Sequence, residues 1–210
     1  MAALTELLVL PALDRVLQAS LQKALDGKAK PVGALGRIEG LALTLGLIQQ
    51  TLRPTVTKPV LLVFAGDHGL TRSGVAAYPA GVTVAMVDTL LTGRASANAF
   101  AKVVGAQVQV IDAGVAADLS DRAGLIHAKV APGTKDASVE PAMTPDQAEA
   151  ALLEGAAMAR AAIDDGADVI ALGEMGIGNS ASAALLMHRL APAPLIDCVG
   201  QGAGHSPEGM

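Results

Sequence analysis

The sequence has no tryptophan, and its aromatic side chains are two Phe and one Tyr. It also lacks any run of basic residues, and its formal net charge is −5 at pH 7. Proteins that bind nucleic acids usually combine a basic patch with aromatic side chains on which bases stack. We therefore expect no nucleic-acid partner, and a flat ligand would be held mainly by aliphatic, Met and backbone groups.

Long apolar runs are absent as well, although hydrophobic residues make up 51% of the chain. A membrane-spanning helix needs about 20 apolar residues in a row. The most apolar windows, residues 60–65 and 169–172, are short and end at glycine. Such runs are typical of buried parallel strands, so we expect no association with a membrane.

Cysteine occurs once, at Cys198, which excludes an internal disulfide and agrees with a reducing compartment. The first 14 residues lack a basic leader and carry Glu6 within their apolar run, which is unlike a secretory signal. We therefore expect a cytoplasmic protein in which Cys198 is a small apolar side chain of a strand.

Apolar residues recur every three or four positions over residues 11–26 and 35–51, which predicts two helices. The segment between them, residues 28–36, contains Pro and Gly and predicts a loop. We assign residues 1–55 to a helical segment of a small second domain.

Four short apolar runs follow, each ending at a turn that contains glycine: residues 59–65, 108–112, 168–172 and 194–199. Helical patterns over residues 81–104 and 145–165 lie between these predicted strands. Thr144, Pro145 and Gln147 form a capping box at the start of the second helix, and Gly166 ends it. This alternation predicts an α/β fold over residues 56–210, with a parallel sheet flanked by helices in a Rossmann-like three-layer arrangement.

The predicted carboxyl ends of the strands are rich in glycine. They are residues 66–69, 112–114, 173–176 and 200–204. Ligands of parallel α/β sheets bind beyond these ends. We therefore expect one crevice in which the backbone approaches a ligand closely.

The densest of these segments is Gly-Glu-Met-Gly-Ile-Gly-Asn-Ser, residues 173–180. Asn179 or Ser180 would cap a helix that runs to about residue 190, and a helix amino terminus stabilises a phosphate or carboxylate. Two interpretations are open, because such turns bind anions in some proteins and serve only close packing in others. Glu174 either takes part in the chemistry beside a cationic partner or accepts hydrogen bonds from loop amides.

Asp67 and His68 stand side by side at the first strand end, where a metal pair, an acid–base dyad or a loop-fixing aspartate are all conceivable. No His, Cys and Asp cluster with ligand spacing completes a metal site, so we expect no metal and no cofactor. The sequence also lacks a nucleophile elbow and a P-loop. The role of His205, after a glycine-rich turn, stays open.

Several segments resemble one family in its own order: residues 30–39, 64–69, 75–86, 142–144 and 173–180. The family is that of the nicotinate-nucleotide–dimethylbenzimidazole phosphoribosyltransferases, and the likeness extends over nearly the whole chain. It implies transfer of 5-phosphoribosyl from nicotinate mononucleotide to 5,6-dimethylbenzimidazole for the lower ligand of cobalamin. A carboxylate that removes the benzimidazole proton would contribute a factor of about 10²–10⁴ to such a reaction.

The resemblance also implies roles for individual residues. Glu174 would be the catalytic or site-organising acid. Residues 173–179 and 202–204 would border the nucleotide, and residues 76–86 would line the pocket for the base. The full substrate-binding set is Asp67, His68, Ala77, Tyr78, Ala85, Met86, Gly173, Met175, Gly176, Ile177, Gly178, Asn179, Gly202, Ala203 and Gly204.

The chain departs from the family pattern near the base pocket. Family members commonly have Ser before the Tyr-Pro pair and Gln before the Met, where this chain has Ala76, Ala77 and Ala85. A pocket with fewer polar contacts discriminates less among related ligands. We therefore expect relaxed choice of the base.

Family chains are longer, and their later part supplies a phosphate-binding loop, a lysine and the accepted general base. We therefore expect residues 56–210 to be incomplete at the carboxyl end, whether as a fragment, a truncated product or a partial homologue. An incomplete sheet exposes apolar faces and an open edge, so we expect a homodimer or a covering partner. A non-catalytic binding module and a general nucleotide-binding protein stay open as alternative functions.

Overall fold

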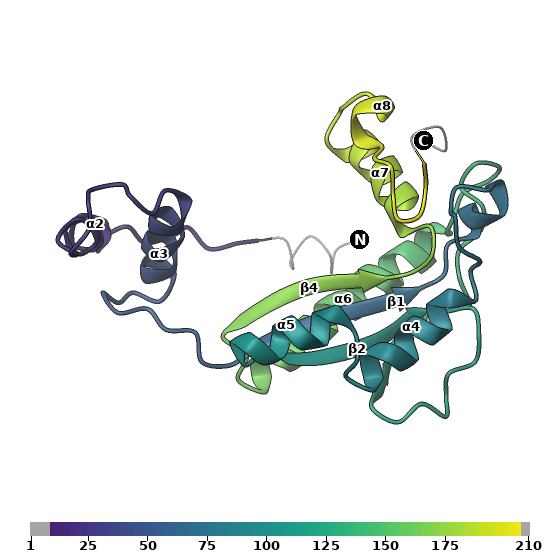
Figure 1. The fold of residues 1–210 in the computed structure, drawn as a ribbon, viewed down its shortest axis with the longest axis horizontal. Coiled ribbons are helices and arrows are strands. Elements are labelled where there is room, and N and C mark those ends of the chain that lie inside the picture. Colours follow the sequence, from purple (N-terminus) through teal and green to yellow (C-terminus); the bar gives the residue numbers. More distant parts are fainter. Residues whose placement is uncertain (1–8, 207–210) are drawn as a thin grey trace. The chain divides into compact units, whose positions relative to one another are not determined.

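The computed structural model describes residues 9–206, which Figure 1 shows as a ribbon. Glu6, on which the expectation about a leader partly depends, lies outside the described residues. The chain divides into two compact units, Met1–Thr57 and Lys58–Met210. Among the helices of residues 9–206, none is long and apolar enough to span a bilayer.

Within residues 9–57, the first unit contains a pair of helices, α2 (Gln18–Asp26) and α3 (Arg37–Ile48). They meet where Leu21 of α2 lies against Gly46 of α3. A Cβ on Gly46 would come within 2.5 Å of the Leu21 Cδ2 atom. The glycine therefore allows the two helices to approach, and Leu21 and Leu47 are buried.

Both helices are shorter than predicted. The first begins at Gln18 rather than at residue 11, because the Asp14 carboxylate accepts a hydrogen bond from the Val16 amide at 2.9 Å. This local bond offers the backbone an alternative to the helix. The second begins only after Gly36, whose φ of 54° and ψ of −126° lie outside the helical region.

The second unit contains a parallel sheet with the strand order β3-β2-β1-β4. The strands are β1 (Pro59–Gly66), β2 (Gln107–Gly114), β3 (Leu125–His127) and β4 (Val169–Met175). In the register, Phe64 lies opposite Glu174 and Gly66 lies opposite Gly114. The carboxyl ends of the three longer strands therefore reach the same edge of the sheet.

Helices cover both faces of this sheet (Figure 1). One face carries α4 (Val82–Leu91) and α5 (Ser96–Val104), and the other carries α6 (Pro145–Asp164). Alternate residues of β1 pack in opposite directions, since Val63 joins the cluster that contains Val87 of α4, and Leu62 joins the one that contains Ala162 of α6. The predicted parallel α/β fold is confirmed.

The residues predicted to begin and end helix α6 make the expected contacts. The Thr144 hydroxyl accepts a hydrogen bond from the Gln147 amide at 3.2 Å, and the Gln147 side chain accepts one from the Thr144 amide at 2.9 Å. Gly166 follows the helix with a φ of 93°. Local sequence alone therefore defines both ends of this helix.

Several predicted elements differ from the structure. The single helix expected over residues 81–104 is two helices, because Gly93 between them has a φ of 74°. The three-residue strand β3 was not predicted. Strand β4 continues past residue 172 to Met175, so Gly173 and Glu174 belong to the strand rather than to a turn.

The strand predicted over residues 194–199 was wrong. This segment forms a short helix, α8 (Leu195–Cys198), which packs on α7 (Asn179–Leu190). A short apolar run does not by itself distinguish a strand from a buried helix. Cys198 is therefore a half-buried residue of a helix, and residues 200–204 are not a strand end.

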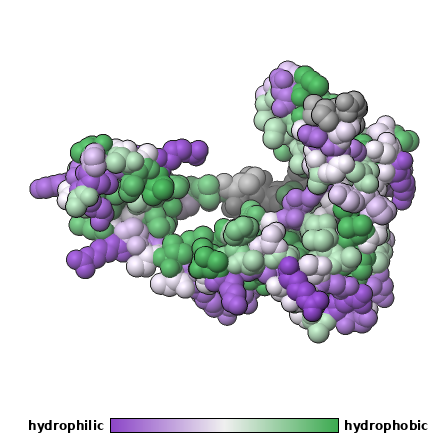
Figure 2. All heavy atoms as spheres, in the orientation of Figure 1, coloured by the Kyte–Doolittle hydropathy of each residue, from purple (hydrophilic) through white to green (hydrophobic). Residues whose placement is uncertain are grey.

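Hydrophobic side chains reach the surface at α5 and β4 (Figure 2). Phe100, Val103 and Val104 of α5 are exposed, as is Leu172 of β4, with an exposed fraction of 76%. Strand β4 also forms one edge of the sheet. Apolar side chains gathered on a surface in this way commonly mark contact with another protein surface.

Candidate functional site

The turn between β4 and α7 lies at the carboxyl edge of the sheet. Gly176 and Gly178 are buried within it, and Gly178 has a φ of 87° at the N-cap position of α7. The expectation that Asn179 or Ser180 caps the helix was therefore wrong. Glycine takes this position because its left-handed backbone conformation is unfavourable for residues that have a Cβ.

The glycines of this turn let the end of β1 approach it. A Cβ on Gly176 would lie 2.0 Å from the Gly66 carbonyl oxygen and 3.1 Å from the His68 ring. One on Gly178 would lie 2.8 Å from the Thr71 Cγ2 atom. Of the two interpretations of these glycines, close packing is thus observed directly, and ligand binding stays a prediction.

His68 connects the end of β1 to helix α7. Its Nδ1 atom lies 2.9 Å from the Ser182 hydroxyl oxygen. Burial lowers the pKa of His68 below its ordinary value of 6.5, while the nearby Glu174 and Asp67 carboxylates offset part of that shift. The lowered pKa favours the neutral imidazole, which acts here as a hydrogen-bonding group.

Glu174 is exposed, and its immediate partner is an amide. The Asn179 side chain donates a hydrogen bond to the Glu174 carboxylate, and its own oxygen accepts one from the Ser180 amide at 2.6 Å. Asn179 thereby orients the carboxylate from the first residue of α7. The arrangement places an accessible anionic oxygen beside the turn.

Several backbone amides of the turn already have acceptors within the protein. The Ile177 amide donates to the hydroxyl of Thr83 at 3.2 Å. The Asn179 amide donates to the Gly176 carbonyl at 3.1 Å, and the Ser180 amide donates to the Asn179 side chain. A bound phosphate would therefore need the other amides of the turn or a rearrangement of these bonds.

Asp67 holds the loops around the end of β1. Its carboxylate accepts a hydrogen bond from the Ala116 amide at 2.8 Å, and its backbone bonds to Gly114 and Thr134. This is the loop-fixing arrangement among the three roles considered from the sequence. Within residues 9–206, no group of three His, Cys, Asp or Glu side chains is placed to hold a metal ion.

The segment after α8 approaches the predicted base-binding residues. Gly204 has a φ of 82°, and its Cβ would lie 2.7 Å from the Tyr78 ring and 3.1 Å from Ala77. The His205 Nε2 atom lies 3.1 Å from the Val75 carbonyl oxygen. Gly204 thus reaches the Tyr78 segment, although residues 200–204 are not a strand end.

The remaining predicted site residues belong to α4, β4 and the segment after α8. Ala85 and Met86 follow Thr83 on α4, where Ala85 is exposed and Met86 is half-buried. Gly173 and Met175 belong to β4, and Met175 packs on the core beneath α4. Ala203 is exposed. The binding roles of all these residues stay predictions.

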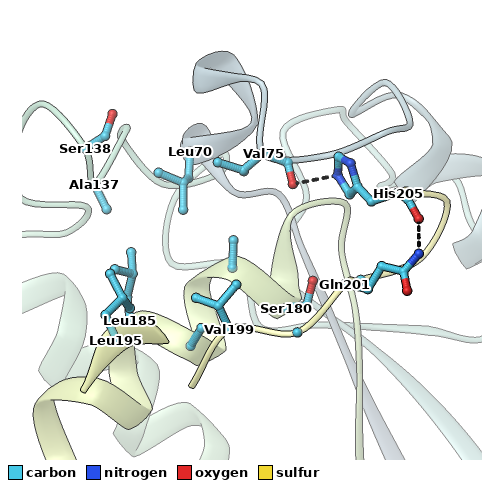
Figure 3. Close-up of a pocket in the computed structure, with 14 residues that line it drawn as sticks. Leu70, Val75, Ala137, Ser138, Ser180, Leu185, Leu195, Val199, Gln201 and His205 are labelled. Carbon is cyan, nitrogen blue, oxygen red and sulfur yellow. Dashed lines mark hydrogen bonds between the residues drawn. The ribbon is translucent and has the colours of Figure 1, made fainter. Parts of the chain in front are cut away.

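A pocket of about 300 Å³ lies beside the turn (Figure 3). Ser180, Gln201 and His205 stand at one end of it, and Leu185 and Leu195 stand at the other. The sequence indicated three parts of its wall, at Val75, Ser180 and residues 200–202, and it did not indicate the others. The lining residues are Leu70, Val75, Ala137, Ser138, Ser180, Ala181, Ala184, Leu185, Leu195, Val199, Gly200, Gln201, Gly202 and His205.

Asp136 joins two loops next to this pocket and was not predicted. Its carboxylate accepts hydrogen bonds from the hydroxyls of Ser73 and Ser138, each at 2.7 Å. The Ser73 bond, followed by the Ser138 bonds, holds the pKa of Asp136 below its ordinary value. No local pattern in the sequence indicated this link, because Ser73 and Asp136 are far apart along the chain.

Comparison with known proteins identifies the family. A family model described as phosphoribosyltransferase matches residues 10–210. The chain belongs to this phosphoribosyltransferase family. The resemblance noted in the sequence is thereby confirmed.

Two relatives show how far the likeness of this phosphoribosyltransferase chain extends. A protein of Cupriavidus necator is 48% identical over 198 residues, covering 94% of this chain and 57% of the relative. One of Dechloromonas aromatica is 49% identical over 197 residues, with the same coverage. Both are named nicotinate-nucleotide–dimethylbenzimidazole phosphoribosyltransferase. The chain thus spans 57% of the length of these relatives.

A solved structure shows the same fold. The crystal structure of CobT from Thermus thermophilus is 42% identical in sequence and superposes with a TM-score of 0.86. The match covers 92% of this chain and 58% of that one.

Proposed function

We propose that this chain takes part in phosphoribosyl transfer from nicotinate mononucleotide to 5,6-dimethylbenzimidazole, with α-ribazole 5'-phosphate and nicotinate as products. The observation that supports it most is the meeting of the family's segments at one place. The β4–α7 turn contacts the β1 end and the start of α4 at the carboxyl edge of the sheet, and Gly204 contacts the Tyr78 segment. This edge is where parallel α/β sheets bind ligands.

The proposed chemistry exchanges one nitrogen for another at the ribose. The bond from C1 to the nicotinate nitrogen breaks, and a benzimidazole nitrogen forms the new bond through an oxocarbenium-like transition state. The other benzimidazole nitrogen then gives up its proton to a carboxylate. We assign a catalytic role to Glu174, since its exposed oxygens and its hydrogen bond from Asn179 suit a group that accepts a proton or faces a developing cation.

In this proposal the nucleotide lies against residues 173–179 and 202–204, and the base lies near Ala77, Tyr78, Ala85 and Met86. Asp67 and His68 support the nucleotide side from the end of β1. No cofactor or metal is required for the transfer, because the nicotinate leaves as a neutral ring nitrogen.

The decisive test mixes the purified chain with nicotinate mononucleotide and dimethylbenzimidazole and measures α-ribazole phosphate by chromatography and mass spectrometry. Product above background would show that this chain alone is active, and Glu174→Gln should then reduce the rate by about 10²–10⁴-fold if Glu174 transfers the proton. Calorimetric binding of the nucleotide without product would favour a non-catalytic binding module. Absence of both binding and product would refute the proposal.

We further propose that base choice is relaxed by the alanines at 76, 77 and 85. A competition assay with benzimidazole, dimethylbenzimidazole and adenine should show similar rates of incorporation. Ala85→Gln should sharpen the preference because it adds a hydrogen-bonding group to the pocket. Strong selectivity in the unaltered chain would contradict this assignment.

We also propose that the chain forms a homodimer in the cytoplasm. The exposed apolar side chains of α5 and β4 support a covered surface, and the single cysteine agrees with a reducing compartment. Sedimentation velocity should show a dimer, and cell fractionation should recover the protein with cytoplasmic markers. A stable, non-aggregating monomer would argue against the dimer.

A further inference from the structure

The β4–α7 turn is held in place by side chains from two other parts of the fold. One is Thr83 of α4, and the other is His68 at the end of β1, which bonds to Ser182 of α7. Thr83 and Ser182 lie outside the predicted substrate-binding set. The resemblance included Thr83 among residues 76–86 but did not indicate its contact with the turn, and no pattern indicated Ser182.

Thr83 is fully buried, with an exposed fraction of 0%. Its hydroxyl oxygen accepts the hydrogen bond from the Ile177 amide at 3.2 Å, across 94 positions of sequence. A buried hydroxyl and a backbone amide both need partners. The bond therefore satisfies two polar groups at once and fixes which way the amide at the centre of the turn points.

His68 holds the other side of the turn. Its ring lies close enough to Gly176 that a Cβ there would come within 3.1 Å of it, and its Nδ1 atom reaches the Ser182 hydroxyl one turn into α7. The titratable groups that face the ring are Asp67 and Glu174. The imidazole thus ties the end of one strand to the helix that follows another.

We propose that Thr83 and the His68–Ser182 pair are positioning residues that preset the β4–α7 turn for the nucleotide. The inference rests on the proposed function for the identity of the ligand. A turn whose amides are already oriented loses less conformational entropy when it binds. Removing the Thr83 or the Ser182 hydroxyl should therefore weaken nucleotide binding, although neither residue belongs to the predicted substrate-binding set.

Thr83→Val tests the first contact, because it keeps the shape of the side chain and removes the hydroxyl. We expect nicotinate mononucleotide to bind about fivefold more weakly by calorimetry, the loss of one ordinary hydrogen bond. Thr83→Ser keeps the hydroxyl and should restore binding to within about twofold of the original, a difference much smaller than one hydrogen bond. Thr92→Val, the same change at the exposed end of α4, is the matched control and should have no effect.

Amide hydrogen exchange tests the positioning role without any ligand. The Ile177 amide should exchange faster in Thr83→Val than in the original chain, and at the original rate in Thr83→Ser and Thr92→Val. If the unaltered chain fails to bind the nucleotide, the proposed function fails, and this exchange measurement still decides the positioning role. Unchanged exchange and unchanged affinity in Thr83→Val would overturn it.

A double-mutant cycle tests the second contact. Ser182→Ala and His68→Gln should each weaken nucleotide binding, and the two together should do so by less than the product of the single effects, because they remove one shared bond. Independent, multiplicative effects would show that the two side chains do not act as a pair. His127→Gln, at an exposed position on the end of β3, should leave binding unchanged.

Discussion

The loop before α3 in the first unit and the β4–α7 turn in the second are both rich in glycine, yet their glycines do different things. Gly33 and Gly36 of the loop have φ values of 76° and 54°, and a Cβ on either would meet no atom within 4 Å. Gly176 of the turn has no such dihedral requirement, but its Cβ would lie 2.0 Å from a carbonyl oxygen. Glycine provides conformational freedom at Gly33 and Gly36, whereas at Gly176 it allows close approach.

The two segments also differ in what holds them. The loop is held by its own neighbours in sequence, since Lys30 and Glu39 form an ion pair at 2.8 Å with side chains only 12% and 11% exposed. The turn is held by Thr83 and His68, which belong to other elements. A segment closed by local contacts keeps its shape with little outside help, whereas the turn depends on the packing of the whole unit.

The largest expected effect comes from Gly176→Ala. The new methyl group would displace either the end of β1 or the turn, so the free energy of unfolding should fall by about 3 kcal/mol and nucleotide binding should be lost. Urea denaturation followed by circular dichroism measures the first, and calorimetry measures the second. Gly155→Ala is the control, because a Cβ at this position of α6 meets nothing and should raise stability by about 0.5–1 kcal/mol. If Gly176→Ala left the free energy of unfolding unchanged, close approach would not explain the glycine at this position.

Gly36→Ala should have a smaller effect that comes from the backbone alone. The required φ of 54° is unfavourable for alanine, so the first unit should lose about 1–2 kcal/mol. Hydrogen exchange of the α3 amides measures this loss, and exchange in β1 should not change. Gly40→Ala, inside α3 and also in open space, should instead protect the helix. Equal effects of the two substitutions would contradict the dihedral explanation.

Glu39 gives the loop an acid-sensitive contact. The hydrogen bond with Lys30, followed by the bond from the Leu35 amide, lowers the pKa of Glu39 below its ordinary value of 4.5. The stabilising contribution is therefore complete above the ordinary value and is lost as the pH falls through the lowered one. In Glu39→Gln this part of the acid dependence should disappear, as measured by α3 amide exchange between pH 3 and 6. An unchanged pH profile would show that the ion pair does not hold the loop.

The smallest expected effect is the pH dependence contributed by His68. Its pKa is lowered by burial, so the unfolded chain takes up a proton before the folded chain does. Stability should therefore fall as the pH decreases from the ordinary value of 6.5 to the lowered one. Urea titrations between pH 5 and 8 should show this component in the original chain and in His127→Gln, and not in His68→Gln. Its persistence in His68→Gln would assign it to another group.

Much of the fold was predictable because its signals are local. The apolar runs of β1, β2 and β4 and the capping box of α6 each depend on neighbouring residues, and the parallel α/β core follows from their alternation. The strand predicted over residues 194–199 was wrong because the prediction used only a local signal, and a short apolar run fits both a strand and a helix. Strand β3 is too short to leave a signal.

The residues of the site likewise divide into those that the sequence indicated and those that only the structure shows. Its glycine-rich turn and the Asp67–His68 pair stand out in the sequence, and their order along the chain indicated the family. Ser182 and Asp136 did not stand out, because each contacts a residue that is far away along the chain. The resemblance included Thr83 among residues 76–86 but did not indicate its bond to Ile177. The sequence of α4 does not indicate that the Thr83 hydroxyl accepts a hydrogen bond from a distant amide.

The sequence by itself determined the kind of fold, the family and the segments from which the site is built, because periodicity, caps and short motifs are properties of neighbouring residues. Only the tertiary structure decided why Gly176 of the β4–α7 turn is needed. The loop at Gly33 and Gly36 requires glycine for its dihedral angles, whereas Gly176 requires it because the end of β1 lies against it. That difference depends on which atoms fill the space around each residue.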